Sequence, residues 1–267
     1  MTSSRSPQQT LASVYDEGAA AYERYWAPAL HRHARALLDP VPIGPTRTVV
    51  DVAAGAGTLT PSLRVLAGQG GQVVALDRSR GMLLRAPADQ SRIQADAARL
   101  PLAGTTADVV VLAFVLFLLP DARAAVAEAA RVLRPGGWLL ATTWGSQDGT
   151  GADVVVREEL DAAEAPAFPE LPRSDELTDS PDRMADLLAG AGLRDVHTTA
   201  QPLDAVFDPD SALAMRTGAG ALGWRYARLG RSAQDAVRRK AATRLAALPE
   251  DDFVDRSHVL LTTARRP

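Results

Sequence analysis

Short runs of aliphatic residues alternate along the chain with longer segments whose apolar positions recur at helical spacing. The aliphatic runs begin near Thr48, Gln72, Arg92, Asp108 and Gly137, and each has the length of a buried parallel strand. The segments between them have the apolar spacing of amphipathic helices. Strands that alternate with helices predict an α/β fold, a Rossmann-like doubly wound sheet whose five parallel strands are joined by right-handed crossovers.

The pattern changes on both sides of this core. Residues 10–39 have the spacing of two helices, and short apolar runs predict two further strands at 196–199 and 257–263. Between those strands, residues 202–250 again have helical spacing. Insertions of this size between sheet edges are often functional lids. We therefore expect residues 202–250 to form a helical cap that covers a substrate together with residues 10–39.

A glycine-rich turn follows the first strand. Gly55 and Gly57 carry no side chains, so a ligand can approach the backbone, and the helix that follows favours a negative group such as a carboxylate. Asp51 lies inside the strand, where an ionised carboxylate is costly unless it is hydrogen-bonded. It could hold the amides of the turn or reach a ligand amine. A turn without a ligand remains an alternative, and Thr60 departs from the third glycine of a nicotinamide-binding fingerprint.

Two further acidic residues stand at strand ends. Asp77 ends the second strand, where a carboxylate can accept hydrogen bonds from both hydroxyls of a ribose. The alternative is that Asp77 caps the helix beginning near Ser79. Asp96 follows the third strand, where it could bind the exocyclic amine of adenine or serve only as a turn residue.

The segments that carry these residues resemble the class I S-adenosylmethionine-dependent methyltransferases, in the branch that includes the ubiquinone/menaquinone-type and small-molecule enzymes. Asp51–Gly57 is similar to the family's D-x-G-x-G-x-G turn, with Ala53 in the first glycine place. Asp77–Leu83, Asp96–Pro101 and Arg131–Trp138 resemble its D-x-S-x-x-M-L, D-A-x-x-L-P and R-V-L-x-P-G-G-x stretches. The resemblance covers residues 10–144 and fades after Gly145.

The resemblance implies S-adenosylmethionine as the cofactor and S-adenosylhomocysteine as its product. The residues it places at the cofactor are Tyr15, Tyr22, Asp51, Ala53, Gly55, Gly57, Asp77, Arg78, Met82, Asp96, Ala97, Ala113 and Phe114. Aromatic residues near the expected reaction centre or in the cap are the candidates for contact with the substrate: Trp26, Phe117, Trp144 and Trp224. The alternative for these aromatic residues is packing in the core.

The resemblance also implies an organisation. Residues 1–267 form one methyltransferase domain, with the cofactor-binding core at 46–145 and the cap contributed by 10–39 and 202–250. The sheet has seven strands, of which the last is antiparallel to the others.

The expected chemistry needs little from a protein base. An activated sulfonium methyl can be displaced in line by an O, N or C nucleophile, and alignment alone can supply about 7–11 kcal/mol of the barrier. Phe117 stands where relatives often carry histidine, which removes one possible base. His31 and His33 remain as weak candidates; they are two positions apart on a helix, so they cannot form a metal-binding pair, and we expect no metal site.

Composition restricts the partners. The net charge of −3 argues against a nucleic-acid partner, and the absence of cysteine excludes disulfides, thiolate metal sites and a cysteine nucleophile. The apolar run at 109–119 is shorter than the roughly 20 residues that span a bilayer, and the N-terminus lacks an apolar signal core. We expect a cytoplasmic enzyme without a membrane partner that acts on a small, partly apolar metabolite, with secondary-metabolite biosynthesis suggested by the resemblance.

Three alternatives from other classes stay open. The chain could bind S-adenosylmethionine without methylating, as a cyclase or decarboxylase-type enzyme does. It could be a nicotinamide oxidoreductase, which Thr60 and Asp96 disfavour. It could be a regulatory binding module, although the charge pattern suggests no macromolecular partner.

Overall fold

The computed structural model describes residues 6–42, 44 and 47–267. Backbone contacts divide the chain into two compact units. The sheet unit consists of Leu30–Ser146, Pro172–Pro202 and His258–Pro267, within the described residues. The helical unit consists of the described residues of Met1–Ala29, Gln147–Leu171 and Leu203–Ser257.

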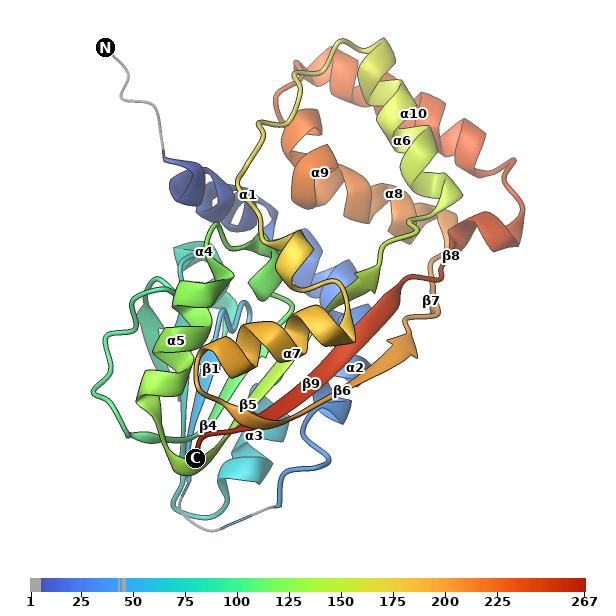
Figure 1. Ribbon diagram of the computed structural model, residues 1–267. Coiled ribbons are helices and arrows are strands. Elements are labelled where there is room, and N and C mark those ends of the chain that lie inside the picture. Colours follow the sequence, from blue (N-terminus) through green and yellow to red (C-terminus); the bar gives the residue numbers. More distant parts are fainter. Residues whose placement is uncertain (1–5, 43, 45–46) are drawn as a thin grey trace. The chain divides into compact units, whose positions relative to one another are not determined.

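The sheet unit contains seven strands in the order β3-β2-β1-β4-β5-β9-β6 (Figure 1). They are β1 (Thr48–Val52), β2 (Gln72–Asp77), β3 (Ser91–Gln94), β4 (Ala107–Ala113), β5 (Leu133–Ser146), β6 (Arg194–Pro202) and β9 (His258–Arg265). Strands β1 to β5 pair in parallel, and β9 is antiparallel to both β5 and β6. The predicted fold class is confirmed, including the antiparallel last strand.

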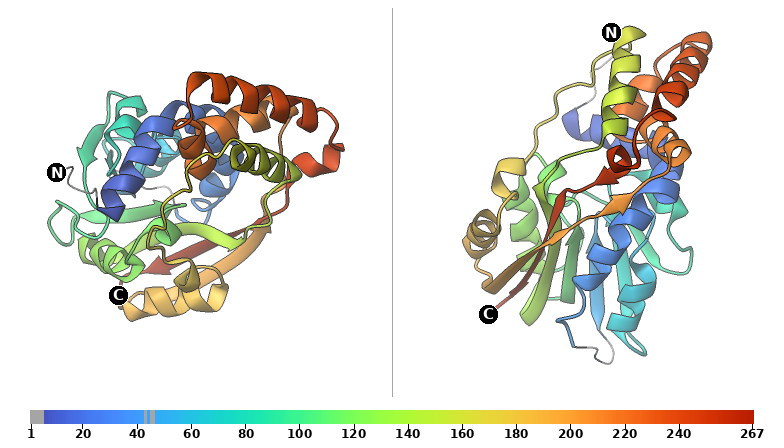
Figure 2. Two further views of the ribbon diagram at one scale, coloured as in Figure 1. Left: turned by 90° about the horizontal axis from the view of Figure 1, so that it is seen from above. Right: turned by 90° about the vertical axis from the view of Figure 1, so that its right-hand side faces the viewer.

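Helices cover both faces of this sheet. They are α3 (Thr60–Ala67), α4 (Arg80–Arg85), α5 (Ala122–Val132) and α7 (Pro181–Gly190), with short 3-10 helices η2 (Leu116–Leu118) and η3 (Asp175–Leu177). In the edge-on view of Figure 2, α5 and α7 lie on one face and α3 on the other. The apolar sides of α5 and α7 form the main core with the strands, through residues such as Val126, Leu188 and Leu139.

The N-terminal part of the chain differs in detail from the prediction. Helix α1 (Pro7–Ala21) begins three positions before Thr10 because Ser6 and Gln9 form a capping box, with the Ser6 amide donating to the Gln9 side chain at 2.9 Å. A π-helical segment, η1 (Tyr22–Trp26), then joins α1 to α2 (Ala27–Ala36), which crosses from the helical unit into the sheet unit.

The helical unit gathers segments that are distant in sequence. Besides α1 and η1 it contains α6 (Gly151–Ala162), α8 (Pro209–Gly218), α9 (Gly220–Tyr226), α10 (Arg231–Leu245), the 3-10 helix η4 (Glu250–Phe253) and the short strands β7 (Ala205–Val206) and β8 (Val254–Asp255). The insertion between the last two strands is therefore helical, as predicted. Its first two helices, α8 and α9, are separated by Ala219, whose extended backbone ends α8 and precedes α9.

Glycines let α1 approach the junction of α8 and α9 closely. A Cβ atom on Gly18 would lie 3.1 Å from the carbonyl oxygen of Gly218, and one on Gly218 would lie 2.5 Å from Cβ of Ala21. Larger side chains at these positions would push the helices apart. The N-terminal helix and the insertion thus pack as parts of one body.

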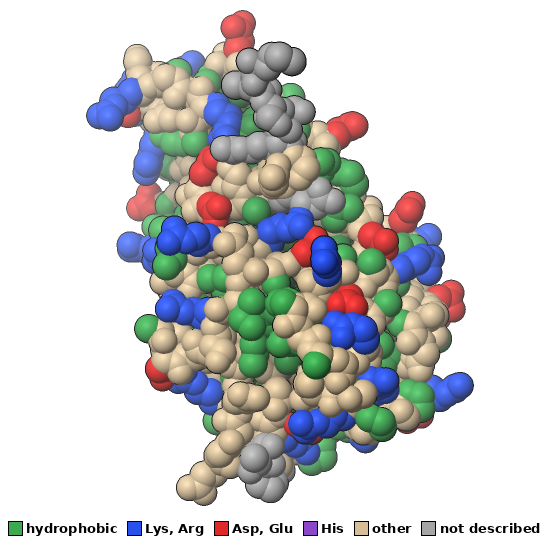
Figure 3. Space-filling view, turned by 90° about the vertical axis from the view of Figure 1, so that its left-hand side faces the viewer, with side chains coloured by type: hydrophobic (Ala, Val, Ile, Leu, Met, Phe, Trp, Pro, Cys, Tyr) green, Lys and Arg blue, Asp and Glu red, His purple; other side chains and the backbone are tan. Residues whose placement is uncertain are grey.

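The described residues contain no helix that is both long and apolar enough to cross a membrane. On the face shown in Figure 3, Lys and Arg side chains of the described residues lie among Asp and Glu side chains. That face therefore carries charges of both signs.

Candidate functional site

The glycine-rich turn after β1 leaves an opening beside its backbone. Ala53, Gly55 and Gly57 have positive φ angles of 60°, 57° and 74°. A Cβ atom on Gly55 would meet nothing within 4 Å, whereas one on Gly57 would lie 2.7 Å from Cδ of Pro87. Gly57 is therefore required by packing, while Gly55 borders space through which a ligand can approach the backbone. Ala53 occupies the first glycine place at a conformational cost of about 1 kcal/mol.

Asp77 joins this turn to the turn after β2. Its Oδ2 accepts a hydrogen bond from the Gly55 amide at 2.8 Å, and its Oδ1 accepts one from the Ser79 amide at 2.7 Å. Ser79 is the residue that caps α4, because its hydroxyl oxygen accepts from the Met82 amide at 3.0 Å. Asp77 is not the cap, and each of its carboxylate oxygens has the capacity for a second donor, as binding of two ribose hydroxyls requires.

Asp51 is a buried carboxylate with an unmatched oxygen. Its side chain is 2% exposed, and its Oδ2 has no hydrogen-bond partner among the described residues. Burial, followed by the nearby charge of Asp77, raises the pKa of Asp51 to about 7. The amide of the turn, at Gly55, is held by Asp77, so Asp51 does not perform that predicted role there. An unmatched buried carboxylate oxygen suits a ligand amine.

Asp96 is held in a tight turn after β3. Its Oδ1 accepts from the Ala98 amide at 3.0 Å, and its backbone carbonyl accepts from the Arg99 amide at 3.0 Å. Arg78 forms an ion pair with its Oδ2, and the two side chains remain 38% and 40% exposed. Asp96 is therefore fixed in direction and still reachable by a ligand.

The remaining predicted residues of this group lie nearby in the fold. Met82 is buried in α4 at 2% exposure, Ala97 packs against the main core, and Ala113 is the last residue of β4, opposite Thr142 of β5. They offer apolar surface and no titratable group.

Strand order brings these residues into a row. Asp96 follows β3, Asp77 ends β2, Asp51 lies in β1, Phe114 follows β4, and Trp144 lies near the end of β5. These strands are neighbours in that order, and all five run in parallel. Their carboxyl ends therefore meet at one edge, the edge at which open α/β sheets bind ligands.

An aromatic cluster stands at the β4–β5 end of this row. The rings of Phe114 and Trp144 are 5.2 Å apart, and those of Phe117 and Trp144 are 6.4 Å apart. Phe114 has a φ of 54°, a conformation that is rare and strained for an aromatic residue, and its amide donates to the carbonyl of Thr142 at 2.9 Å. Strain of this kind is concentrated at functional sites.

One neighbour of the cluster was not predicted. The guanidinium of Arg173 lies 5.3 Å from the centre of the Phe117 ring and is oriented by Asp175, which accepts from it at 2.6 and 2.8 Å. Arg173 belongs to a Pro-rich stretch with no periodic pattern, so nothing local in the sequence connects it with Phe117. Hydrogen bonds from Ser174 to the backbone around η2, such as the one to the Leu119 carbonyl at 2.7 Å, hold the segment there.

Four predicted site residues belong to the helical unit. Tyr15 and Tyr22 are in contact, with ring centres 5.9 Å apart. Trp26 instead stacks on Phe207 at 5.9 Å. Trp224 has the guanidinium of Arg228 3.7 Å from its ring centre and meets Phe168 edge-on at 5.4 Å. Within their unit these four aromatic residues lie in three separate clusters.

The two histidine candidates differ in environment. His33 is 3% exposed; its Nε2 accepts from Arg32 at 3.1 Å, which assigns the proton to Nδ1 and makes Nδ1 the donor to Gln201 at 3.4 Å. These bonds join α2 to β6 and give His33 a packing role. His31 has a buried Nδ1 without a hydrogen-bond partner in the described part of the chain. Among the described residues there is also no group of three or more His, Asp or Glu placed to hold a metal ion.

Comparison with known proteins finds a matching protein family and similar curated proteins. Residues 50–141 match a family model described as a methyltransferase domain. A demethylmenaquinone methyltransferase of Mycolicibacterium paratuberculosis is 31% identical over 210 residues, which are 68% of this chain and 84% of that protein. Further curated relatives with the same description are 35% identical over 49% of the chain, which spans little more than half of their length.

Solved structures with low sequence identity share the fold. A phosphoethanolamine N-methyltransferase 2 of Haemonchus contortus, solved with S-adenosylhomocysteine, has a TM-score of 0.58 at 17% identity; the match covers 99% of this chain and 61% of that one. The [4+2]-cyclase SpnF has a TM-score of 0.59 at 16% identity over 99% of this chain and 98% of its own. At such identities the likeness concerns the fold alone.

Proposed function

This chain belongs to the class I S-adenosylmethionine-dependent methyltransferases, in their quinone-type branch, and we propose that it methylates a planar, hydroxylated aromatic metabolite of quinol type. Its cofactor is S-adenosylmethionine and it acts on a small molecule.

The row at the sheet edge fits the parts of the cofactor in order. We assign Asp96 to the adenine amine, Asp77 to the ribose hydroxyls and Asp51 to the ammonium of the amino-acid end. Two observations support the last assignment. The buried Oδ2 of Asp51 has no hydrogen-bond partner among the described residues, and a ligand ammonium would supply one. The open space beside Gly55 leaves room for the ligand to approach the backbone. When bound, the cofactor supplies a methyl group already activated by its sulfonium.

The aromatic cluster supports a planar, partly apolar acceptor. Phe114, Phe117 and Trp144 are each exposed by less than a tenth and offer ring faces and edges. Phe117 cannot take a proton, so this position supplies no base; an enolate-like carbon, a phenolate oxygen or an amine is a nucleophile that would need none. The guanidinium of Arg173 lies 5.3 Å from the centre of the Phe117 ring, but its charge is balanced by the ion pair with Asp175, so the pair adds no net charge to the cluster. The names of the curated relatives favour a quinol nucleus over other secondary metabolites.

The helical unit contributes to selection of the substrate in this proposal. Tyr15 and Tyr22 are assigned to the cofactor, and Trp26 and Trp224 to the substrate. Residues 46–145 form the cofactor-binding core of a single domain, with 10–39 and 202–250 as its cap. The resemblance to the family fades after Gly145, in the segments that supply α6 and α8 to α10 of this unit, which is where we expect substrate identity to be encoded.

The observation that carries the proposal is the row of Asp96, Asp77, Asp51 and the aromatic cluster along the ends of adjacent parallel strands. The test is incubation with methyl-labelled S-adenosylmethionine and a panel of quinols, naphthols and aromatic amines. We expect a quinol or naphthol to gain one labelled methyl group with release of S-adenosylhomocysteine. Exclusive methylation of non-aromatic acceptors would contradict the substrate class, and conversion of a substrate without consumption of the cofactor would identify a non-methylating enzyme.

A further inference from the structure

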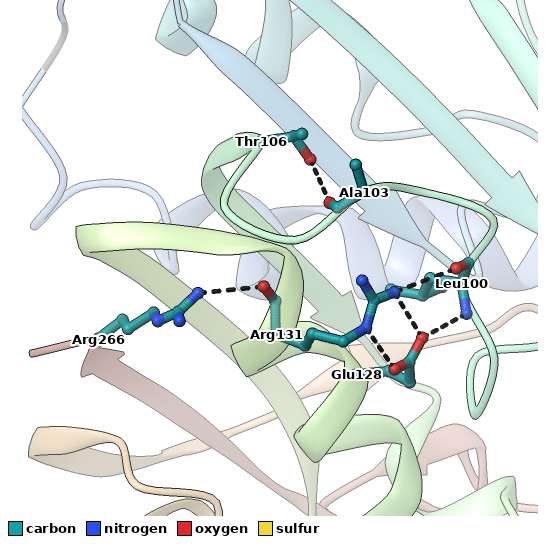
Figure 4. Close-up of polar contacts among 6 residues, drawn as sticks. All are labelled: Leu100, Ala103, Thr106, Glu128, Arg131 and Arg266. Carbon is teal, nitrogen blue, oxygen red and sulfur yellow. Dashed lines mark hydrogen bonds and ion pairs between the residues drawn. The ribbon is translucent and has the colours of Figure 1, made fainter.

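The loop that carries Asp96 is attached to the last turn of α5. This loop joins β3 to β4 and has no regular structure apart from turns and one isolated bridge between Asp96 and Arg99. Figure 4 shows that Glu128 and Arg131, one turn apart on α5, point at Leu100 in this loop. These contacts tie the loop to the helix.

Both backbone polar groups of Leu100 are held. Its amide donates to Oε2 of Glu128 at 2.8 Å, and its carbonyl oxygen accepts from Nη2 of Arg131 at 3.2 Å (Figure 4). The Leu100 side chain is 4% exposed and packs in the main core. The loop is thus fixed at a point four residues beyond Asp96.

Glu128 and Arg131 also fix each other. Nε and Nη2 of Arg131 donate to the two carboxylate oxygens of Glu128 at 2.6 and 2.8 Å, a planar arrangement in two parallel bonds. The hydrogen bond from Arg131 holds the pKa of Glu128 below its usual value, so the pair stays charged at neutral pH. Neither side chain belongs to the sheet edge itself.

The rest of the loop is attached to the same helix end. The Arg131 carbonyl oxygen accepts from the Thr105 amide and from Nη1 of Arg266, each at 3.0 Å. The Thr106 hydroxyl donates to the Ala103 carbonyl at 2.9 Å (Figure 4). The helix end therefore supports the loop at two places, of which Leu100 is the nearer to Asp96.

We propose that Glu128 and Arg131 are positioning residues for recognition of the cofactor's adenine. By holding Leu100 they set the turn that aims Asp96, so they determine how well the adenine amine is recognised without touching it. This inference rests on the proposed assignment of Asp96 to that amine. It gives Arg131, the first residue of the Arg131–Trp138 motif, and Glu128, one turn before it, a role in cofactor selectivity.

The experiment compares two ligands in one variant. Glu128→Gln keeps the size of the side chain and removes the charge that bonds both Arg131 and Leu100. We expect the Kd of S-adenosylhomocysteine to rise about tenfold, the scale of one weakened charged hydrogen bond. The Kd of S-inosylhomocysteine, in which a carbonyl replaces the amine, should rise less than about threefold, and kcat at saturating cofactor should stay within about twofold. Arg131→Lys, which keeps the positive charge but loses the bidentate geometry, should show the same pattern if Glu128→Gln fails to fold.

The matched control is Asp179→Asn, which removes the carboxylate from another two-bond pair, Arg183–Asp179, next to α7. It should change neither Kd. A folded Glu128→Gln protein that binds S-adenosylhomocysteine as the wild type does would overturn the proposal, and so would an equal loss of affinity for both ligands. If the wild type itself binds both ligands equally, the assignment of Asp96 fails and the positioning role fails with it. A wild type that discriminates between the ligands, beside a variant that binds S-adenosylhomocysteine unchanged, refutes the positioning role alone.

Discussion

Asp77 is the residue on which most of the cofactor assignment depends. Both its carboxylate oxygens bind backbone amides, at Gly55 and Ser79, so its removal loosens two turns as well as the ribose contact. We expect Asp77→Ala to weaken binding of S-adenosylhomocysteine by roughly 2–4 kcal/mol, the scale of losing charged hydrogen bonds. Calorimetry on the variant, with circular dichroism to establish folding, measures this. Wild-type affinity in a folded Asp77→Ala protein would show that the carboxylate serves only the two turns.

Asp51 predicts an unusual pH dependence of stability. Burial raises its pKa from 3.8 to about 7, so between those pH values the folded protein holds a proton that the unfolded chain has lost. Its contribution to the free energy of unfolding is therefore greatest below pH 4 and falls as the pH rises towards 7, by up to about 4 kcal/mol. Asp51→Asn, which cannot ionise, should lack this fall. Chemical denaturation across pH 5–8 measures the free energy of unfolding of the wild type and of Asp51→Asn. If the two free energies change with pH in parallel, the buried environment assigned to Asp51 is wrong.

The same carboxylate links cofactor binding to pH. A ligand ammonium beside Asp51 favours the ionised form, so the affinity for S-adenosylhomocysteine should increase as the pH rises through 7, and binding should release protons. Titration in buffers of different ionisation enthalpy measures the protons released. Asp51→Asn should bind more weakly and without this dependence, whereas a dependence that survives in the variant would have another origin.

At the scale of elements, the close approach of α1 to the α8–α9 junction gives a direct test. Gly218→Ala places a Cβ 2.5 Å from that of Ala21, so the helices have to separate or the variant loses stability. We expect a loss of about 1–3 kcal/mol, as for other overpacked contacts. Gly190→Ala at the end of α7 is the matched control, because its Cβ would meet nothing within 4 Å. Equal thermal stability of the two variants would contradict the packing described for the helical unit.

Elements were predictable from the sequence where their signals are local. Buried parallel strands appear as continuous aliphatic runs, and the starts of α5 and α7 follow from Asp121 and from Ser180 with the proline that follows it. The π-helical segment and the packing of α6 with α10 depend on contacts between distant segments, which no local pattern encodes. The strand-end aspartates were predictable because each lies in or next to an aliphatic run. The bond between Asp77 and Gly55 and the position of Arg173 over Phe117 were not, because each joins segments that are distant in the sequence.

At the scale of the whole molecule, the sheet unit contains the strand-end aspartates and the aromatic cluster, and the helical unit contains Tyr15, Tyr22, Trp26 and Trp224. Trp224 tests whether the helical unit takes part in substrate selection. We expect Trp224→Ala to raise the KM for the substrate or lower kcat while cofactor affinity stays within about twofold. Trp224→Phe, which keeps a ring for Arg228 and Phe168 to contact, should retain more activity. Unfolding of both variants, or equal loss of substrate and cofactor, would make Trp224 a packing residue.

The most direct test of the central claim is a calorimetric titration of the wild-type protein with S-adenosylhomocysteine, alongside a nicotinamide dinucleotide. The row of aspartates at the sheet edge predicts binding of one S-adenosylhomocysteine per chain at micromolar affinity, about −8 kcal/mol, and no heat from the dinucleotide. Binding of the dinucleotide, with no heat from S-adenosylhomocysteine, would contradict the account.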